Sequence, residues 1–313
     1  MRRLALSLLA GALALAGLVG CAADRLPGID ADLTDDWPAM AAAAVPVPES
    51  ERCYSVEYVP TWTGDFADAT IPCGYAHWTE TLYVGTFTGS VAAHATPPPV
   101  GSSDLAAAYS TCATEVDKAL GAPWQTGYLS LNLTLPDDIA WRGGARWYRC
   151  EILALSHDLD ENVVRVTGTA VTAMHGPRLA ARTCRLVRVA PGQSRGGSIG
   201  SSDAIGCDKP HNAEFAGLFR VPGTGEYPDP DTRNDMERLA CFHTAGQFIG
   251  VPAGYTRYLG IYWSDITPEQ WALGIRTGIC NIIGFDGNHG FDTVRFTGSV
   301  KGIGSRKPTG YTF

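Results

Sequence analysis

The feature that most constrains this chain is an internal repeat, because one closely spaced set of reactive side chains occurs twice in its 313 residues. Residues 73–89 (CGYAHWTETLYVGTFTG) and 207–223 (CDKPHNAEFAGLFRVPG) align without a gap at a cysteine, a histidine, a glutamate and a final glycine. A second shared frame, Trp-x-x-Gly-x-Arg-x-x-x-Cys, occurs at residues 141–150 and 271–280. A pattern that recurs at such a distance predicts one structural unit present in two copies.

Each repeated unit is roughly 120 residues long, which is a normal size for a domain with its own core. The predicted domains are residues 51–170 and 182–304, with a short join between them. Residues 21–50, ahead of the first domain, are rich in Ala, Pro and Asp and show no sustained periodicity. That composition predicts a flexible tether.

The N-terminus has the three-part layout of a secretory signal, with Arg2 and Arg3, an apolar run from Leu4 to Val19, and then Cys21. The run is too short for a comfortable transmembrane span. The sequence LVGC that ends at Cys21 resembles the lipobox of bacterial lipoproteins. The resemblance implies that residues 1–20 are removed as a signal peptide and that Cys21 carries diacylglycerol and an acyl chain such as palmitate. Two or three chains anchor a protein firmly; the alternative is a free secreted protein.

The charge balance argues against one class of partner. Removing residues 1–20 removes two arginines, which leaves 22 basic residues against 32 acidic ones and a net charge of −10. Binding to a nucleic-acid backbone needs clustered Lys and Arg, so nucleic acid is not expected as a partner. The lipid would place the chain on the outer face of the cytoplasmic membrane, outside the cytoplasm.

Eight cysteines remain after Cys21, an even number in an exported chain, which predicts disulfide bonds. No two of them lie closer than twenty positions, which argues against Cys-x-x-Cys zinc sites. Each predicted domain has four, and four cysteines allow three pairings among which sequence alone does not choose. We favour the pairing that joins cysteines in predicted strands that could be sheet neighbours. The favoured bonds are Cys53–Cys150, Cys73–Cys112, Cys184–Cys280 and Cys207–Cys241.

Local patterns predict the elements of each domain. Residues 53–59, 81–89 and 146–155 are rich in β-branched and aromatic side chains and are typical of strands. Residues 102–121 begin with Ser and Asp, end with a glycine and place apolar side chains on one helical face, and residues 231–250 match them. The expected apolar face consists of Leu105, Tyr109, Cys112, Val116 and Leu120. The predicted fold class is α+β, with two similar disulfide-linked domains that each contain a mostly antiparallel sheet and one main helix.

Taken together, both halves resemble the septum formation domain of exported actinobacterial lipoproteins. The resemblance rests on a strand that begins with a cysteine, the Cys-x-x-x-His-x-x-Glu motif, a helix that contains a cysteine, and the closing Trp-x-x-Gly-x-Arg-x-x-x-Cys frame. It covers nearly all of the chain beyond the tether, twice. It implies a role in the cell envelope linked by name to septum formation and cell division, and it implies no catalytic mechanism and no cofactor.

The repeated His-x-x-Glu pairs have two interpretations. A histidine and a glutamate can bind a metal or act as an acid–base pair, but a metal usually needs at least three protein ligands and the local sequence offers two. Alternatively the imidazole bonds a backbone carbonyl or the glutamate, or the glutamate pairs with the arginine of the closing frame. The residues concerned are His77, Glu80, Trp141 and Arg146 in the first unit and His211, Glu214, Trp271 and Arg276 in the second.

Two further loops contain reactive side chains. Residues 192–196 (GQSRG) fit the Gly-x-Ser-x-Gly pattern of a hydrolase nucleophile, but a Gly- and Ser-rich segment follows where that motif requires a helix. Asp286, His289 and Asp292 lie in a segment that we interpret as a hairpin, with calcium binding as a lesser alternative.

The sequence therefore predicts a noncatalytic, lipid-anchored envelope protein that binds another cell-surface protein or a wall component. The expected contacts are the groove between the domains and the turns that contain Trp141 and Trp271, since exposed aromatic residues are common anchors. No catalytic residue, metal or cofactor is assigned. The alternative is a metal-dependent hydrolase or metal-binding protein that uses the His-x-x-Glu pairs.

Overall fold

The computed structural model describes residues 45–56, 70–157, 161–189, 199–285 and 293–312. The predicted signal peptide, the lipidation residue Cys21 and most of the predicted tether lie outside the described residues, as do residues 192–196 and 286–292. Within the described residues, the structure contains no helix with the length and apolar character needed to cross a bilayer.

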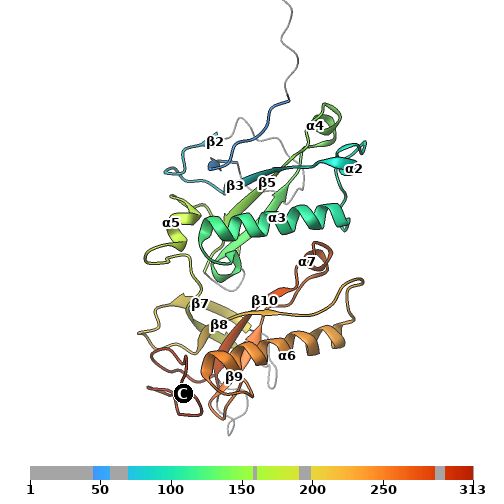
Figure 1. Ribbon diagram of the computed structural model, residues 1–313. Helices are drawn as coiled ribbons and strands as arrows, with labels where there is room; N and C mark the ends of the chain where they lie inside the picture. The colour runs from blue at the N-terminus through green and yellow to red at the C-terminus, as the bar shows by residue number, and fades with distance from the viewer. Residues whose placement is uncertain (1–44, 57–69, 158–160, 190–198, 286–292, 313) are drawn as a thin grey trace, which may run out of the picture. The chain divides into compact units, whose positions relative to one another are not determined.

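The first half of the described chain forms a five-stranded antiparallel sheet in the order β2-β1-β3-β5-β4. The main helix α3 (Ser103–Leu120) packs along one face of this sheet (Figure 1). The strands are β1 (Arg52–Tyr54), β2 (Thr70–Ile71), β3 (Thr79–Thr86), β4 (Leu129–Thr134) and β5 (Trp147–Ala154). Three short helices and one 3-10 turn join them: α2 (Gly89–Ala92), η2 (Trp124–Thr126), α4 (Asp138–Arg142) and α5 (Ala170–Met174).

The second half repeats this plan with a sheet in the order β7-β6-β8-β10-β9. Its main helix α6 (Pro230–Ile249) also packs on one face of the sheet, and a one-turn helix α7 (Pro268–Ala272) takes the place of α4. The strands are β6 (Cys184–Val189), β7 (Ile199–Ile205), β8 (Ala213–Arg220), β9 (Leu259–Trp263) and β10 (Thr277–Gly284). The predicted α+β class with two similar halves is confirmed; both halves lie in one compact unit, and the domain boundaries stay a prediction.

Helix α3 begins and ends where the sequence predicts, and α6 begins at Pro230, one residue before the predicted segment 231–250. The Ser102 hydroxyl accepts a hydrogen bond from the Leu105 N–H at the start of α3, and Gly121 ends it with a left-handed φ of 69°. Asp229 caps α6 in the same way ahead of a proline, and Gly250 ends it at φ 79°. The five side chains of the predicted apolar face of α3 are all buried against the sheet. Strands β2, β4, β7 and β9 were not predicted.

The eight cysteines form disulfides, but the predicted pairing is wrong. Each half has one bond between its first two cysteines and one between its last two, with Cα–Cα distances of 5.2 Å. The observed bonds are Cys53–Cys73, Cys112–Cys150, Cys184–Cys207 and Cys241–Cys280, in place of Cys53–Cys150, Cys73–Cys112, Cys184–Cys280 and Cys207–Cys241.

Strand order explains the correction. Strand β3 lies between β1 and β5, so the cysteines of these two strands are not sheet neighbours. Cys150 packs in the core between sheet and helix, where Cys112 lies on the buried face of α3. Cys53 instead reaches the turn that follows β2. Closing loops of 20 to 39 residues contributes about 3–4 kcal/mol per bond in the chain-entropy model.

In each sheet, an aromatic ring on one strand packs over a glycine on the neighbouring strand, and the two strands exchange these roles between the two halves. Gly85 on β3 is paired in register with Tyr148 on β5, and a Cβ at Gly85 would lie 2.1 Å from the Tyr148 ring. In the second half the glycine and the aromatic residue exchange strands, because Phe219 on β8 is paired with Gly278 on β10 and a Cβ there would lie 2.3 Å from the ring. Each ring therefore lies over a glycine that must have no side chain.

We expect Gly85→Ala and Gly278→Ala each to lower the free energy of unfolding by about 1–3 kcal/mol, because the added methyl group displaces a buried ring. Gly74→Ala is the matched control, since a Cβ there meets nothing within 4 Å. Urea unfolding of the three variants measures the difference. Equal stability of all three would show that the rings do not need the glycines.

Candidate functional site

Both histidines of the repeated motif are buried and are held by the backbone in the same way. The Nδ1 atom of His77 donates a hydrogen bond to the Tyr75 carbonyl at 2.8 Å, and that of His211 donates to the Lys209 carbonyl at 2.7 Å. Only 1% and 0% of these histidines are exposed. Because a carbonyl can only accept, each ring carries its proton on Nδ1.

Each glutamate holds the segment that returns across the end of its sheet. A Glu80 carboxylate oxygen accepts from the Ala170 N–H at 2.6 Å, and Glu214 accepts from the Val300 N–H at 2.8 Å and from the Ser299 hydroxyl. Burial raises the pKa of Glu80, and the Ala170 N–H partly opposes this shift.

The histidines complete the same attachment through their backbones. His77 forms an isolated antiparallel bridge with Val166, and His211 forms one with Phe296. We call residues 164–170 and 294–300 the return segments. Histidine and glutamate therefore fix a return segment to each sheet, which agrees with the structural interpretation of the repeated motif.

The tryptophan and arginine of the closing frame form a second buried tie. Arg146 donates to the Ala92 and Trp141 carbonyls and lies over the Trp141 ring, whose Nε1 donates to the His94 carbonyl. The second half repeats this arrangement: Arg276 lies 3.5 Å from the centre of the Trp271 ring.

Two expectations for these residues are therefore corrected. In the described residues the arginines bind carbonyls rather than Glu80 or Glu214. Trp141 and Trp271 are 0% and 5% exposed, because they pack between α4 or α7 and the chain before the main helix, so these rings are not surface anchors.

Two clusters have the residue types of a metal site. The ligand atoms of Cys53, His77 and Glu80 lie within 4.8 Å of one another, as do those of Cys184, Cys207 and Glu214. A cysteine binds metal as a thiolate, and every one of these cysteines is in a disulfide. The oxidised clusters therefore lack the three ligands that a site normally needs.

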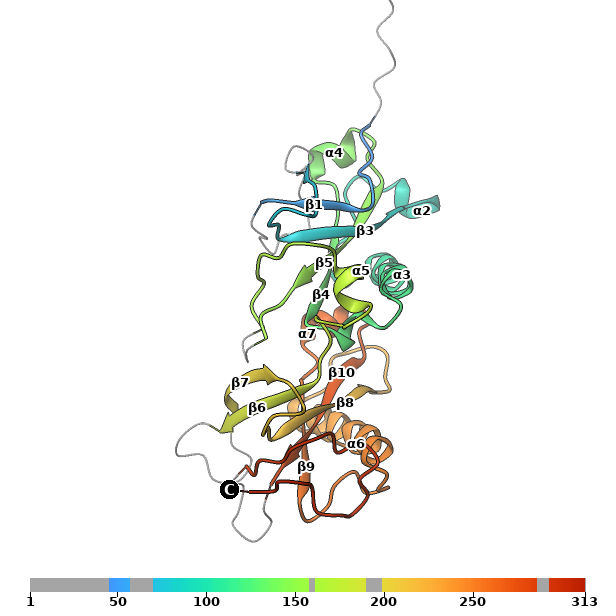
Figure 2. The ribbon, with the colours of Figure 1, turned by 90° about the vertical axis from the view of Figure 1, so that its left-hand side faces the viewer.

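A cavity of about 450 Å³ lies in the first half, beside the His77–Glu80 motif. Its walls come from the end of the sheet, the return segment and the chain after α5. Figure 2 shows α5 beside α3. The lining is mostly apolar, and Leu179 in the lining is 75% exposed. Cavities of this size that combine apolar walls with a few polar groups are typical binding sites. The sequence did not predict this cavity.

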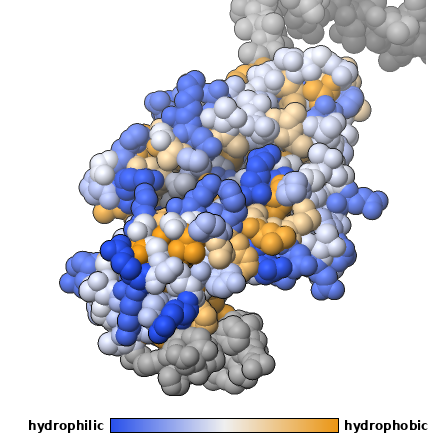
Figure 3. Space-filling model, turned by 60° about the horizontal axis from the view of Figure 1, so that its bottom comes forward, coloured by the Kyte–Doolittle hydropathy of each residue, from blue (hydrophilic) through white to orange (hydrophobic). Residues whose placement is uncertain are grey.

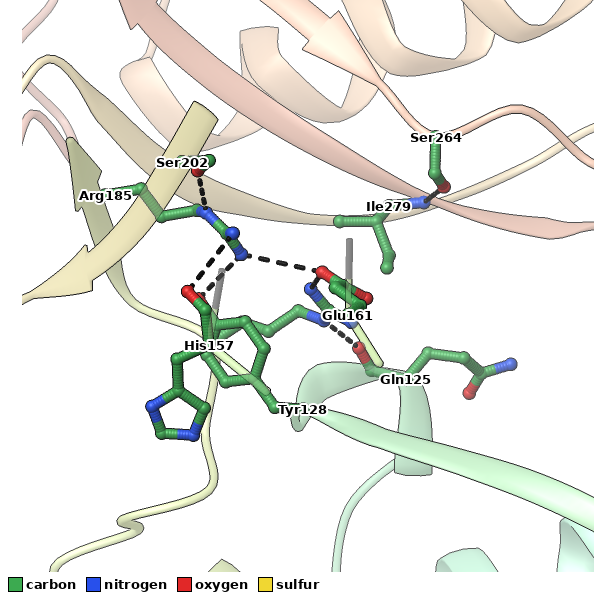
Figure 4. A network of polar contacts seen from close by, with 9 residues as sticks. Gln125, Tyr128, His157, Glu161, Arg185, Ser202, Ser264 and Ile279 are labelled. Atoms are coloured by element: carbon green, nitrogen blue, oxygen red, sulfur yellow. Dashed lines mark hydrogen bonds and ion pairs between the residues drawn. The ribbon is translucent and has the colours of Figure 1, made fainter. Parts of the chain in front are cut away.

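A buried polar network borders the cavity and joins the two halves (Figure 4). Arg185 of β6 donates to the Tyr128 hydroxyl at 2.8 Å, to Ser202 and to the His157 carbonyl. Arg182 makes two hydrogen bonds to Glu161 and lies over the Tyr128 ring. Paired guanidinium–carboxylate contacts of this kind fix geometry. At these residues the expected groove between the domains is therefore filled by polar contacts.

The fold and the two buried motifs define a class of α+β protein with two similar halves, each closed by two disulfides and one return segment. A family model described as "Septum formation" matches residues 52–280, nearly three quarters of the chain and parts of both halves. The chain therefore belongs to the septum formation family, as the resemblance predicted. Neither the curated proteins nor the solved structures contain a match.

The metal and structural interpretations differ in what happens when a histidine is removed. We expect His211→Ala to lower the free energy of unfolding by about 2–4 kcal/mol, because it leaves a void and an unpaired carbonyl, with no bound metal before or after. His243→Ala, at an exposed position of α6, is the control. Elemental analysis and denaturant unfolding of the wild type and the variants distinguish the two interpretations. One equivalent of metal in the wild type that is missing from a His211→Ala variant of unchanged stability would support a metal site.

The raised pKa of Glu80 predicts a pH dependence. A carboxyl group whose folded-state pKa is raised contributes stability fully below its unfolded pKa near 4.5 and loses it as pH rises through the folded pKa. We therefore expect Tm of the wild type to fall relative to Glu80→Gln between pH 4 and 7.

Glu269→Gln is an opposite-sign control for this pH series. Hydrogen bonds from its own backbone N–H and from Thr267 lower the pKa of Glu269, so its contribution is lost as pH falls. If the difference in Tm between the wild type and Glu80→Gln stays constant from pH 4 to 7, the raised pKa of Glu80 is contradicted.

Proposed function

We propose that this chain is a noncatalytic, lipid-anchored protein of the cell envelope that binds another surface protein or a wall component. Membership of the septum formation family supports an envelope role linked to septum formation. The leader ending at Cys21 supports anchoring on the outer face of the cytoplasmic membrane. Four disulfides in one chain fit an oxidising compartment.

The observation that carries the proposal is the apolar cavity on a covalently closed frame. A binding site is most precise when rigid elements hold its walls, and here the sheet, α5 and the return segment do so. The His77 and Glu80 side chains beside the cavity are used to hold backbone groups, which supports binding rather than catalysis.

One face of the molecule also favours a localised contact. On the face shown in Figure 3, apolar residues form small patches separated by polar residues, rather than one continuous apolar area. Large continuous patches are typical of extensive obligate interfaces. No observation favours the metal-dependent hydrolase, because the cysteines nearest to the His-x-x-Glu pairs are oxidised.

The test is covalent capture in intact cells. An amine-reactive crosslinker applied to cells that express the full chain should join it either to an envelope protein or to a peptide of the cell wall. Digestion with wall hydrolases would then release the wall-peptide adduct. Both products are identified by mass spectrometry. Absence of either adduct, at an expression level where the chain's own internal crosslinks are detected, would contradict the binding function.

Cys21→Ser provides the control for anchoring. If Cys21 carries the lipid, this variant appears in the medium and its capture of membrane-associated partners falls sharply, since one residue holds the whole chain at the membrane. A variant that remains with the membrane fraction would contradict the lipid anchor while leaving the binding proposal intact.

A further inference from the structure

The second half shows what can occupy the outer edge of a return segment. Residues 309–312 fold back beside residues 295–297, with one antiparallel bridge at Arg295 and Thr312 and a turn at residues 309–310. The Arg295 N–H donates to the Thr312 carbonyl at 2.8 Å, the Thr312 N–H donates back at 2.9 Å, and the Thr297 N–H donates to the Thr309 carbonyl at 2.8 Å. The C-terminal tail thus pairs through its backbone with the outer edge of the return segment.

An aromatic side chain fastens this tail. The Tyr311 ring packs edge-on against the Tyr258 ring with their centres 5.3 Å apart, and its hydroxyl donates to the Phe285 carbonyl at 2.7 Å. Val294 and Phe296 of the return segment are 0% exposed. The segment that covers this edge is therefore held by backbone hydrogen bonds and one aromatic anchor.

In the first half the described residues leave the corresponding edge uncovered. Arg165 and Thr167 correspond to Arg295 and Thr297, both are exposed, and among the described residues their N–H groups donate to no backbone carbonyl. The corresponding stretch of chain takes another route: the Ala180 carbonyl accepts from the Tyr128 N–H at 2.7 Å on the way to β6. It must take this route because it begins the second half.

The cavity lies at this uncovered edge. Tyr128 and Leu155, which correspond to Tyr258 and Phe285, both line it, as do Val164 and Val166 of the return segment. These two valines are half-buried, whereas their counterparts in the second half are fully buried. Valine in place of Phe296 also leaves room for a ligand side chain.

We propose that this cavity binds an extended peptide segment of a partner protein, which adds as an antiparallel strand along residues 165–167 and inserts an aromatic side chain. This inference rests on the proposed function and specifies its partner as a peptide rather than a glycan. Unpaired N–H groups along an open strand edge recognise a peptide backbone, and an aromatic ring is the commonest anchor for a pocket of this kind. The tail of a second copy is the less favoured occupant, because each tail already lies in its own second half.

Val166→Phe is the decisive variant. It places in the first half the phenylalanine found at the corresponding position of the second half, where the Phe296 and His211 ring centres lie 4.6 Å apart. The variant should therefore fill the cavity with a side chain that the fold already accommodates. Leu179→Ala removes an exposed apolar contact from the lining and provides a second variant that does not alter the core. Leu239→Ala, at a position 60% exposed on α6, is the matched control.

The probe is a phage-displayed random peptide library selected on the full-length chain, followed by synthesis of the enriched peptides. We expect these peptides to share an aromatic residue and to bind Val166→Phe at least tenfold more weakly than the wild type. Leu179→Ala should weaken binding severalfold and Leu239→Ala should not. Fluorescence anisotropy gives the dissociation constants, and thermal unfolding verifies that each variant is folded.

The proposal is overturned if no aromatic peptides are enriched, or if they bind folded Val166→Phe and Leu179→Ala as tightly as the wild type. Concentration-dependent dimers of the wild type that Val166→Phe abolishes would replace the partner protein by a second copy. Failure here is distinguishable from failure of the proposed function: a Val166→Phe chain that still captures its partner in cells would keep the function and remove only the peptide groove.

Discussion

The bond between the main helix and the fourth strand in sheet order is the constraint on which each half depends. Cys112–Cys150 fixes α3 to β5, and Cys241–Cys280 fixes α6 to β10, in both cases at the centre of a buried cluster. With helix and sheet joined in this way, the second disulfide of each half needs only to position the turn that leads into the His-x-x-Glu motif. The covalent frame thus determines where the return segment attaches, and the polar contacts of the motif complete the attachment.

What could be predicted from the sequence depended on local information. The α3 helix follows from Ser102, Gly121 and the spacing of apolar residues between them, which are properties of consecutive residues. The shared plan of the two halves follows from the aligned motifs. The disulfide pairing failed because it depends on strand order, and β3 enters between β1 and β5 by a connection that no local pattern records.

The candidate site was harder to predict for a related reason. The His-x-x-Glu pairs were recognisable, but the glutamates accept hydrogen bonds from backbone N–H groups about 90 positions away in sequence. A backbone donor carries no sequence signal, so an arginine was the natural candidate for the glutamate. At the cavity, the chain after α5 leaves for β6 whereas its counterpart in the second half folds back, and this difference in connectivity leaves no local sequence pattern.

Tyr128 connects the cavity to the junction between the halves. Tyr128 is one of the residues that line the cavity, while its hydroxyl accepts a hydrogen bond from Arg185 and Arg182 lies over its ring. Burial raises the pKa of Tyr128, so the hydroxyl remains protonated and the contact with Arg185 is a hydrogen bond to a neutral group. The corresponding Tyr258 packs on the ring of the C-terminal tail instead. The same position of the repeat therefore contacts the C-terminal tail in the second half, through Tyr258, and the residues that join the two halves in the first half, through Tyr128. A ligand in the cavity would thus lie beside a residue that holds the two halves together.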